Sequence, residues 1–198
     1  AKSAVKIAVD MVKEKLITKK EAVLRVDPNT LDTLLHPTLD ETKEVKTIAK
    51  GLPASPGATS GKVVFSSDEA QRLNDLMQNT ILVRVETSPE DIHGMHAAKG
   101  ILTARGGMTS HAAVVARGMG RPCVSGSSEI EIDYENNLFK SNGYEIKEGD
   151  TITIDGSTGR IILGEVKTVK PEISGDFSKL MSWADSFRKL KIRTNSET

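Results

Sequence analysis

The order of expected elements along the 198-residue chain predicts an α/β fold with a mixed sheet. Between residues 51 and 165, short apolar segments typical of buried strands alternate with helix starts, and this alternation is characteristic of α/β domains. Near the end of that region, Thr151–Ile154 and Arg160–Leu163 flank a turn-rich loop and predict an antiparallel hairpin. A hairpin beside parallel strands makes the sheet mixed.

Residues 1–50 are expected to form a helical arm that carries no evident catalytic group. Four apolar residues recur at helical spacing on one face: Val5, Val9, Val12 and Leu16. The capping-box pattern of Thr18–Glu21 begins a second helix, which should end near Val26. Asp27-Pro28 supplies a cap and a first-turn proline for a third helix, and His36-Pro37 should end it.

Residues 51–165 are predicted to form the main domain, which opens with proline- and glycine-rich turns. Four short apolar segments predict strands: Lys62–Phe65, Ile81–Val83, Ile101–Thr103 and Pro122–Val124. Helices are expected to begin at Ser66–Glu69 and Ser88–Asp91, where a serine cap precedes acidic residues. Glu145–Asp150 has the composition of a solvated turn.

Residues 166–198 are expected to form a linker helix and the beginning of a further element. The pattern weakens through Lys167–Pro171, and a helix follows from about Asp176 to Leu190. Four residues form an apolar stripe on this helix: Leu180, Trp183, Ala184 and Phe187. An aromatic stripe at helical spacing is typical of packing.

The composition excludes several classes of function. Lys plus Arg and Asp plus Glu each number 27, so no basic excess indicates nucleic acid. No apolar segment approaches the roughly 20 residues of a membrane span, and no signal peptide opens the chain. The only cysteine, Cys123, fits a reducing compartment. We therefore expect a cytoplasmic protein without nucleic-acid or membrane partners, and we expect the chain to be part of a longer one.

The segment Gly106–Gly118 carries the strongest chemical signal. Two glycines allow the tight backbone that a closely approaching ligand needs. Thr109 or Ser110 can cap the helix that follows, which leaves His111 in its first turn. Unsatisfied N–H groups and the positive end of the helix dipole favour an anion there and disfavour imidazolium. We therefore expect a neutral His111 that can attack phosphorus, although a lone histidine at a helix start is usually a capping or surface residue.

Two residues near this segment, Arg105 and Ser88, have both a functional and a purely structural interpretation. Arg105 and the N–H groups of Gly106 and Gly107 could bind a phosphate, whereas an exposed loop arginine is usually only solvated. The hydroxyl of Ser88, or that of Thr87, could orient the imidazole of His111, whereas a serine before Pro89 commonly only caps its helix.

His93 and His96 have a spacing that could suit a metal ion. No nearby cluster of cysteine or histidine completes a set of ligands, so we expect no metal site in the chain.

The whole string Gly106–Gly118 resembles the phosphohistidine site of the PEP-utilising enzymes. This family comprises pyruvate, phosphate dikinases, phosphoenolpyruvate synthases and enzyme I of the sugar phosphotransferase system. Met108 makes the string most similar to the dikinases, because synthases and enzyme I tend to carry arginine there. Three other segments extend the resemblance over nearly the whole chain: Leu34–Pro37, Glu86–Asp91 and Lys191–Asn195.

The resemblance implies a compact, swivelling β/β/α phosphohistidine domain between a nucleotide-binding domain and a barrel that binds phosphoenolpyruvate or pyruvate. It implies that His111 carries a phosphoryl group on Nε2 and that Ser110, Arg105, Gly106, Gly107 and Ser88 support it. It also implies a regulatory phosphorylation site at Thr109. Arg193 matches a residue that binds substrate phosphate, a role that requires the barrel.

The reaction implied is the reversible conversion of ATP, phosphate and pyruvate into phosphoenolpyruvate, AMP and diphosphate. The resemblance further implies Mg²⁺ bound by domains absent from this chain, and a homodimeric full enzyme. The chain alone should not turn over. Two alternatives stay open: the same carrier in a phosphoenolpyruvate synthase, and a non-catalytic interaction module that has kept the fold.

Overall fold

The computed structural model describes residues 2–40, 45–169 and 175–190. The chain divides into two compact units. The first comprises residues 1–35 and 171–198, and the second comprises residues 36–170. None of the helices in the described ranges is long and apolar enough to cross a membrane.

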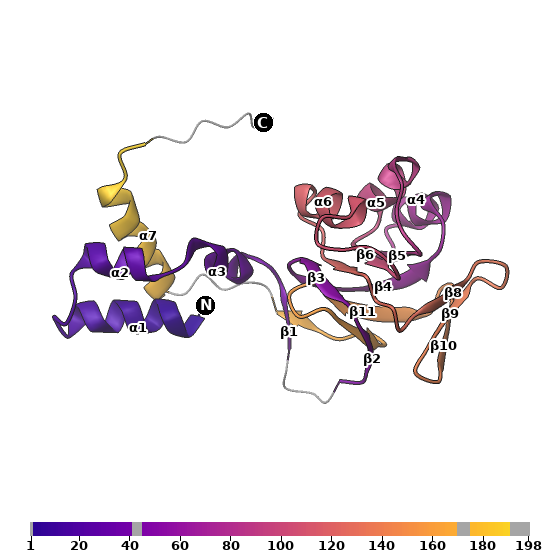
Figure 1. Ribbon diagram of the computed structural model, residues 1–198, viewed down its shortest axis with the longest axis horizontal. Coiled ribbons are helices and arrows are strands. Elements are labelled where there is room, and N and C mark those ends of the chain that lie inside the picture. The colour runs from indigo at the N-terminus through magenta and orange to yellow at the C-terminus, as the bar shows by residue number, and fades with distance from the viewer. Residues whose placement is uncertain (1, 41–44, 170–174, 191–198) are drawn as a thin grey trace. The chain divides into compact units, whose positions relative to one another are not determined.

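The first unit is a small group of helices (Figure 1). Its elements are α1 (Lys2–Lys13), α2 (Lys19–Arg25), α3 (Pro28–Asp32), the 3₁₀ helix η1 (Thr33–Leu35) and α7 (Gly175–Phe187). The predicted capping box is present, since Thr18 Oγ1 accepts from the N–H of Glu21 while Glu21 accepts from the N–H of Thr18. The buried apolar side chains among the described residues of this unit come from α1, α2, its C-cap and α7: Val5, Ala8, Val9, Ala22, Val26 and Leu180.

Two predicted positions in this helical core are wrong. Leu16 lies beyond the end of α1 and is 62% exposed, and Ala8 packs in the core instead. Phe187 is 44% exposed at the last residue of α7, whereas Phe177 packs against the core. In both cases the apolar pattern in the sequence extends beyond the residues whose side chains pack against the neighbouring helices.

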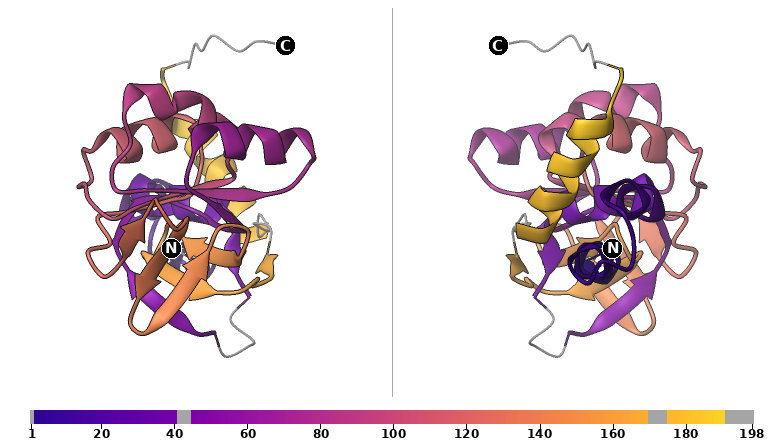
Figure 2. Two further views of the ribbon diagram at one scale, coloured as in Figure 1. Left: turned by 90° about the vertical axis from the view of Figure 1, so that its right-hand side faces the viewer. Right: turned by 90° about the vertical axis from the view of Figure 1, so that its left-hand side faces the viewer.

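The second unit is built on an eight-stranded mixed sheet, in agreement with the predicted class (Figures 1 and 2). The strand order is β2-β12-β11-β4-β5-β6-β7-β3. The bounds are β2 (Thr47–Lys50), β3 (Leu52–Ser55), β4 (Ala58–Val64), β5 (Thr80–Arg84), β6 (Gly100–Thr103), β7 (Cys123–Ser125), β11 (Thr151–Asp155) and β12 (Arg160–Leu163). The four neighbours β4, β5, β6 and β7 are parallel, and the other pairs are antiparallel. The predicted hairpin is the β11–β12 pair.

Helices cover one face of the sheet (Figure 1). They are α4 (Ser67–Asp75), α5 (Ile92–Ala97), which follows the 3₁₀ helix η2 (Pro89–Asp91), and α6 (His111–Gly118). Alternation along β5 divides the core, because Leu82 packs toward the helices while Ile81 and Val83 pack on the opposite face. The helix-side core is rich in alanine, whereas the opposite core is mostly β-branched, with Phe65 and Phe139. Small residues allow α6 to lie close to the sheet.

Seven strands of the described residues were not predicted, including the short β1 (Thr38–Leu39) and β13 (Thr168–Val169). β2 and β3 lie where helix and turn were expected, and a second, three-stranded sheet contains β8 (Glu131–Asp133), β9 (Leu138–Ser141) and β10 (Tyr144–Lys147). The segment predicted as a solvated turn at 145–150 is therefore strand up to Lys147. Its exposed residues alternate with the buried Ile146, which is the period of an edge strand and not of a turn.

The domain boundary predicted between residues 50 and 51 lies inside the sheet. β2 ends at Lys50 and pairs with β12, so residues 36–50 belong to the second unit. A short ladder closes this unit, because β1 (Thr38–Leu39) pairs antiparallel with β13 (Thr168–Val169). The boundary predicted at residue 165 correspondingly moves to residue 170.

Candidate functional site

His111 is the first residue of α6, and it follows a loop that leaves β6 at Thr103. Ser110 is the N-cap, and its Oγ accepts from the N–H of Ala113 at 3.3 Å. The first turn of α6 holds no acidic residue. The positive end of this helix is therefore not neutralised by a carboxylate of its own first turn, which favours an anion at His111.

Among the described residues, the imidazole of His111 has one side-chain hydrogen-bond partner, the hydroxyl of Thr87. Thr87 Oγ1 lies 3.0 Å from His111 Nδ1, and Thr87 is nearly buried. Ser88, which the resemblance assigns to the supporting set, donates from its N–H and Oγ to Asp91 Oδ2 at 2.9 and 3.3 Å. Of the two hydroxyls that the sequence left open, the one at the imidazole is therefore that of Thr87.

The two glycines before the helix differ in what they require. Gly106 has a φ of 116°, and a Cβ there would lie 2.9 Å from both Ser110 Cβ and Ser125 Oγ. A Cβ on Gly107 would meet nothing within 4 Å. Only Gly106 is therefore required by the backbone and its neighbours, and Gly107 instead leaves open space beside the loop.

Arg105 is exposed, and its backbone N–H donates to Val85 O at 2.8 Å. This bond attaches the loop before His111 to the loop that carries Thr87. The guanidinium makes no hydrogen bond or ion pair with another residue of the described ranges, so it is available to solvent or to a ligand.

Residues outside the predicted set anchor α6 and its cap. Arg117 Nη2 donates to Ala54 O at 2.8 Å and to Met108 O at 3.4 Å, which ties the end of the helix to β3 and to the loop before His111. Ser125 Oγ lies 3.2 Å from Ser110 Oγ and 3.1 Å from Thr103 Oγ1. Arg117 belongs to the histidine string and could have been considered, whereas nothing in the sequence singles out Ser125.

Cys123 is a nucleophile by residue type, but it does not belong to the site. It is buried in β7 under α6, and burial raises the pKa of its thiol to about 12, an effect that Arg117 partly opposes. A protonated thiol is a poor nucleophile near neutral pH. Cys123 packs in the core between the sheet and the helices.

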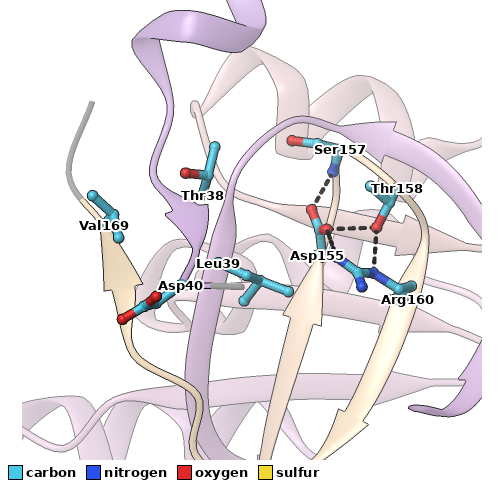
Figure 3. Close-up of a pocket in the computed structure, with 8 residues that line it drawn as sticks. All are labelled: Thr38, Leu39, Asp40, Asp155, Ser157, Thr158, Arg160 and Val169. Carbon is cyan, nitrogen blue, oxygen red and sulfur yellow. Dashed lines mark hydrogen bonds and ion pairs between the residues drawn. The ribbon is translucent and has the colours of Figure 1, made fainter. Parts of the chain in front are cut away.

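A pocket of about 490 Å³ lies beside the β1–β13 ladder, and no residue of the 104–111 loop lines it. Figure 3 shows the cluster of Asp155, Ser157, Thr158 and Arg160 at this place. Asp155 accepts from the N–H of Ser157 at 3.0 Å and from Thr158 Oγ1 at 2.5 Å, and it pairs with Arg160 at 3.4 Å. These bonds satisfy the buried carboxylate within its own turn, so the cluster stabilises the β11–β12 hairpin.

The remaining predicted positions lie apart from this arrangement. Thr109 is exposed, directly before the cap of α6. His93 and His96 are exposed on α5, and the described residues contain no group of three or more side chains suited to a metal ion. Arg193 lies outside the described residues.

Comparisons with known proteins agree with this geometry. Residues 76–159 match the family model "PEP-utilising enzyme, mobile domain". Over the full chain, the sequence is 61% identical to a pyruvate, phosphate dikinase of Rhizobium meliloti, 54% to one of Clostridium symbiosum and 52% to a chloroplastic one of Arabidopsis thaliana. The chain covers 22%, 23% and 21% of these three relatives, or about a fifth of their length.

A solved structure titled as an Enzyme I protein overlaps with 57% of this chain and with 40% of its own chain, at 24% sequence identity and a TM-score of 0.33. The family match includes the whole segment from Thr87 through His111 to the end of α6. By these comparisons, residues 76–159 are similar to the mobile domain of the PEP-utilising enzymes, and the whole chain is similar to a segment of the pyruvate, phosphate dikinases.

Proposed function

We propose that this chain is the phosphoryl-carrier segment of a pyruvate, phosphate dikinase, and that His111 carries the phosphoryl group on Nε2. The observation that supports this most strongly is the pairing of Nδ1 of His111 with Thr87 at the N-terminus of a helix without first-turn acids. This arrangement occupies one ring nitrogen and leaves the other for reaction.

In the proposed mechanism, the Thr87 contact engages Nδ1 of His111, and the reaction takes place at Nε2. A neutral imidazole has one protonated and one unprotonated nitrogen, and a threonine hydroxyl can donate or accept. When Nδ1 carries the proton and donates to Thr87 Oγ1, the lone pair is on Nε2 and can attack phosphorus. The N–P bond forms as the P–O bond of the donor breaks, and the leaving oxygen takes the electron pair. Nδ1 keeps its proton throughout.

The surroundings of His111 suit the phosphorylated form. The dianionic group on Nε2 would lie near the positive end of α6. We propose that Arg105 and the N–H groups of Gly106 and Gly107 contribute to its stabilisation, with Ser110 holding the helix start. Ser88 has a different role, because its polar groups are directed to Asp91.

We propose the overall reaction that the resemblance to the dikinases implies. ATP, phosphate and pyruvate would give phosphoenolpyruvate, AMP and diphosphate through a pyrophosphorylated and then a phosphorylated His111. Phosphoryl transfer depends on positioning and charge neutralisation, to which Mg²⁺ contributes when bound. The described residues near His111 do not fit a Mg²⁺ site, since the buried carboxylate of Asp91 is already occupied by protein donors. We propose that Mg²⁺, the nucleotide site and the pyruvate site belong to other domains of a cytoplasmic, homodimeric enzyme.

The carrier would have to move between those domains. The chain passes between its two units at residues 35–36 and 170–171, and we propose these connections as the hinges. Thr168–Val169 is strand β13 and pairs with β1, so the second connection follows this ladder. We further propose Thr109 as a regulatory phosphorylation site, because it is exposed next to the cap of α6.

A chimaeric enzyme tests this function. The present 198 residues replace the matching segment of the Rhizobium meliloti dikinase, which aligns over the full length of the chain. We expect phosphoenolpyruvate formation that requires ATP, phosphate and pyruvate, at a rate within about tenfold of the parent enzyme, because a carrier domain has to dock with two partners without loss of geometry.

The matched control is the same chimaera with His111→Asn, which keeps the size and polarity of the side chain but cannot accept a phosphoryl group. It should lose ATP/AMP exchange and pyruvate/phosphoenolpyruvate exchange together. A folded chimaera that keeps either exchange without His111 would show that another residue carries the group. A folded but inactive parent chimaera would favour the interaction-module alternative.

A further inference from the structure

Asp91 is a buried carboxylate next to the segment that carries Thr87, and the function proposed above does not use it. It is 5% exposed and has four polar neighbours. Oδ2 accepts from the N–H and Oγ of Ser88, Oδ1 accepts from Ser67 Oγ at 3.2 Å, and Oδ1 lies 3.3 Å from Arg84 Nε. A capping box requires only the first of these oxygens. The second oxygen connects the end of β5 with the start of α4.

The segment 85–88 is held at both ends. At one end, the N–H of Val85 donates to the hydroxyl oxygen of Tyr134 at 2.8 Å, and Val85 O accepts from the N–H of Arg105. At the other end, the N–H of Ser88 donates to Asp91 at 2.9 Å. Thr87 lies between these fixed points, so the place of its hydroxyl depends on both of them.

The groups around Asp91 are closely packed and hydrogen-bonded to one another. Arg84 donates from Nη1 to Phe65 O at 3.0 Å, and its guanidinium lies 5.3 Å from the ring centroid of Tyr134. A Cβ on Gly94 would lie 2.5 Å from Ser67 Cα, so α5 packs directly against the start of α4. Asp91 therefore has little room to shift relative to its partners, and a buried carboxylate that lost one of them would be costly.

We propose that Asp91 is a positioning residue for phosphoryl transfer, which holds the hydroxyl of Thr87 against Nδ1 of His111 and so keeps the lone pair on Nε2. This inference rests on the proposed function of His111. It assigns Asp91, with Arg84 as its partner, to the control of the imidazole tautomer. The carboxylate does not touch the imidazole, and it acts through the Ser88 N–H and the peptide that joins Ser88 to Thr87.

The test measures the tautomer directly in the ¹⁵N-labelled chain. Long-range ¹H–¹⁵N correlations report which ring nitrogen of His111 is protonated, at about pH 8.5, where an ordinary imidazole is neutral. His111→Asn identifies the signals. Thr87→Val defines the change that follows loss of the hydroxyl. We expect Asp91→Ala to change the ¹⁵N chemical shifts of both ring nitrogens of His111 in the same direction as Thr87→Val does. The change should be at least half as large as in Thr87→Val.

Two further variants separate positioning from charge and from general destabilisation. Glu90→Ala removes an exposed carboxylate one residue earlier and should leave the ring signals unchanged. Asp91→Asn keeps an oxygen that can accept from the Ser88 N–H, so it should restore most of the parent signal. If Asp91→Ala does not fold, Asp91→Asn and Arg84→Lys are compared with Thr87→Val instead. Both should change the ¹⁵N signals of the His111 ring in the same direction, but by less.

Reactivity supplies a second measurement. Phosphoramidate transfers its phosphoryl group to an imidazole nitrogen and releases ammonia, so it phosphorylates His111 without any other domain. We expect the rate at Nε2 to fall about tenfold in Asp91→Ala and in Thr87→Val, which corresponds to about 1.4 kcal/mol.

Parent-like ring signals in folded Asp91→Ala, beside changed signals in Thr87→Val, would overturn the role of Asp91 while leaving the proposed function intact. Parent-like signals in both variants would also overturn it, because Asp91 would then have no Thr87 contact to hold. Failure of the chimaera, by contrast, would concern only the function of His111.

Discussion

Two helical segments of the second unit have similar N-caps, but they differ in the charge of their first turns. Each follows one of the neighbouring parallel strands β5 and β6, and each has a serine at its N-cap. At Ser88 the third residue of the helical segment is Asp91, whose carboxylate accepts from the cap. At Ser110 the equivalent residue is the buried Ala113, and the first turn contains no acid. The first site is neutralised by the chain itself, and the second is left for an external anion.

This difference shows how the segments that follow two neighbouring strands supply both a reactive group and its support. The neutralised site holds Thr87 in place, and the open site presents His111. A helix N-terminus that already holds a carboxylate gains little from a phosphoryl group, because the positive end of the dipole is occupied. The reactive histidine therefore belongs at the start without acids.

Thr109→Glu removes the difference between the two helix starts, because it places a carboxylate at the start of α6, which otherwise has none in its first turn. The added charge would lie close to the incoming phosphoryl group and repel it. Because Thr109 is exposed, we expect a penalty of about 1–2 kcal/mol, or a five- to thirtyfold slower phosphorylation. The measurement is single-turnover phosphorylation of the chimaera by phosphoenolpyruvate, with Thr109→Gln as the control of equal size. Equal rates for the two variants would mean that position 109 does not face the reacting group.

Ser110→Ala and Ser88→Ala sharpen the comparison through stability. Ser110 Oγ is the acceptor for the N–H of Ala113, so its loss should lower the free energy of unfolding by about 1 kcal/mol. At Ser88 the backbone N–H still donates to Asp91 when the hydroxyl is removed, so the loss should be smaller. Denaturant unfolding of the chain measures both. A larger loss of unfolding free energy in Ser88→Ala than in Ser110→Ala would contradict this ranking of the two caps.

Most of the elements around His111 could be predicted from the sequence because local signals define them. The helix starts at Ser66, Ser88 and Ser110 carry caps, and the parallel strands are short apolar segments between turns. The string Gly106–Gly118 identified the histidine and its helix before any geometry was known.

The elements that were missed depend on distant partners. β2 and β3 form because β12 and β7 accept them as neighbours, and neither has the apolar run of a buried strand. Similarly, the choice between Thr87 and Ser88 at His111 depends on Asp91, which draws Ser88 away from the imidazole. The hydroxyls of Ser125 and Thr103 behind Ser110 come from two further strands, and no spacing in the sequence joins them.

The central claim is that Nε2 of His111 carries the phosphoryl group, and locating that group is its most direct test. The chimaera is incubated with labelled phosphoenolpyruvate and quenched in alkali, in which phosphohistidine survives. Peptide mass spectrometry then assigns the residue, and ³¹P–¹⁵N correlations in the denatured protein assign the nitrogen. The account predicts one phosphoryl group per chain, on Nε2 of His111, and none in His111→Asn. A phosphoryl group on Nδ1 of His111, or on His36, His93 or His96, would contradict it. So would a phosphoryl group on the chimaera that carries His111→Asn.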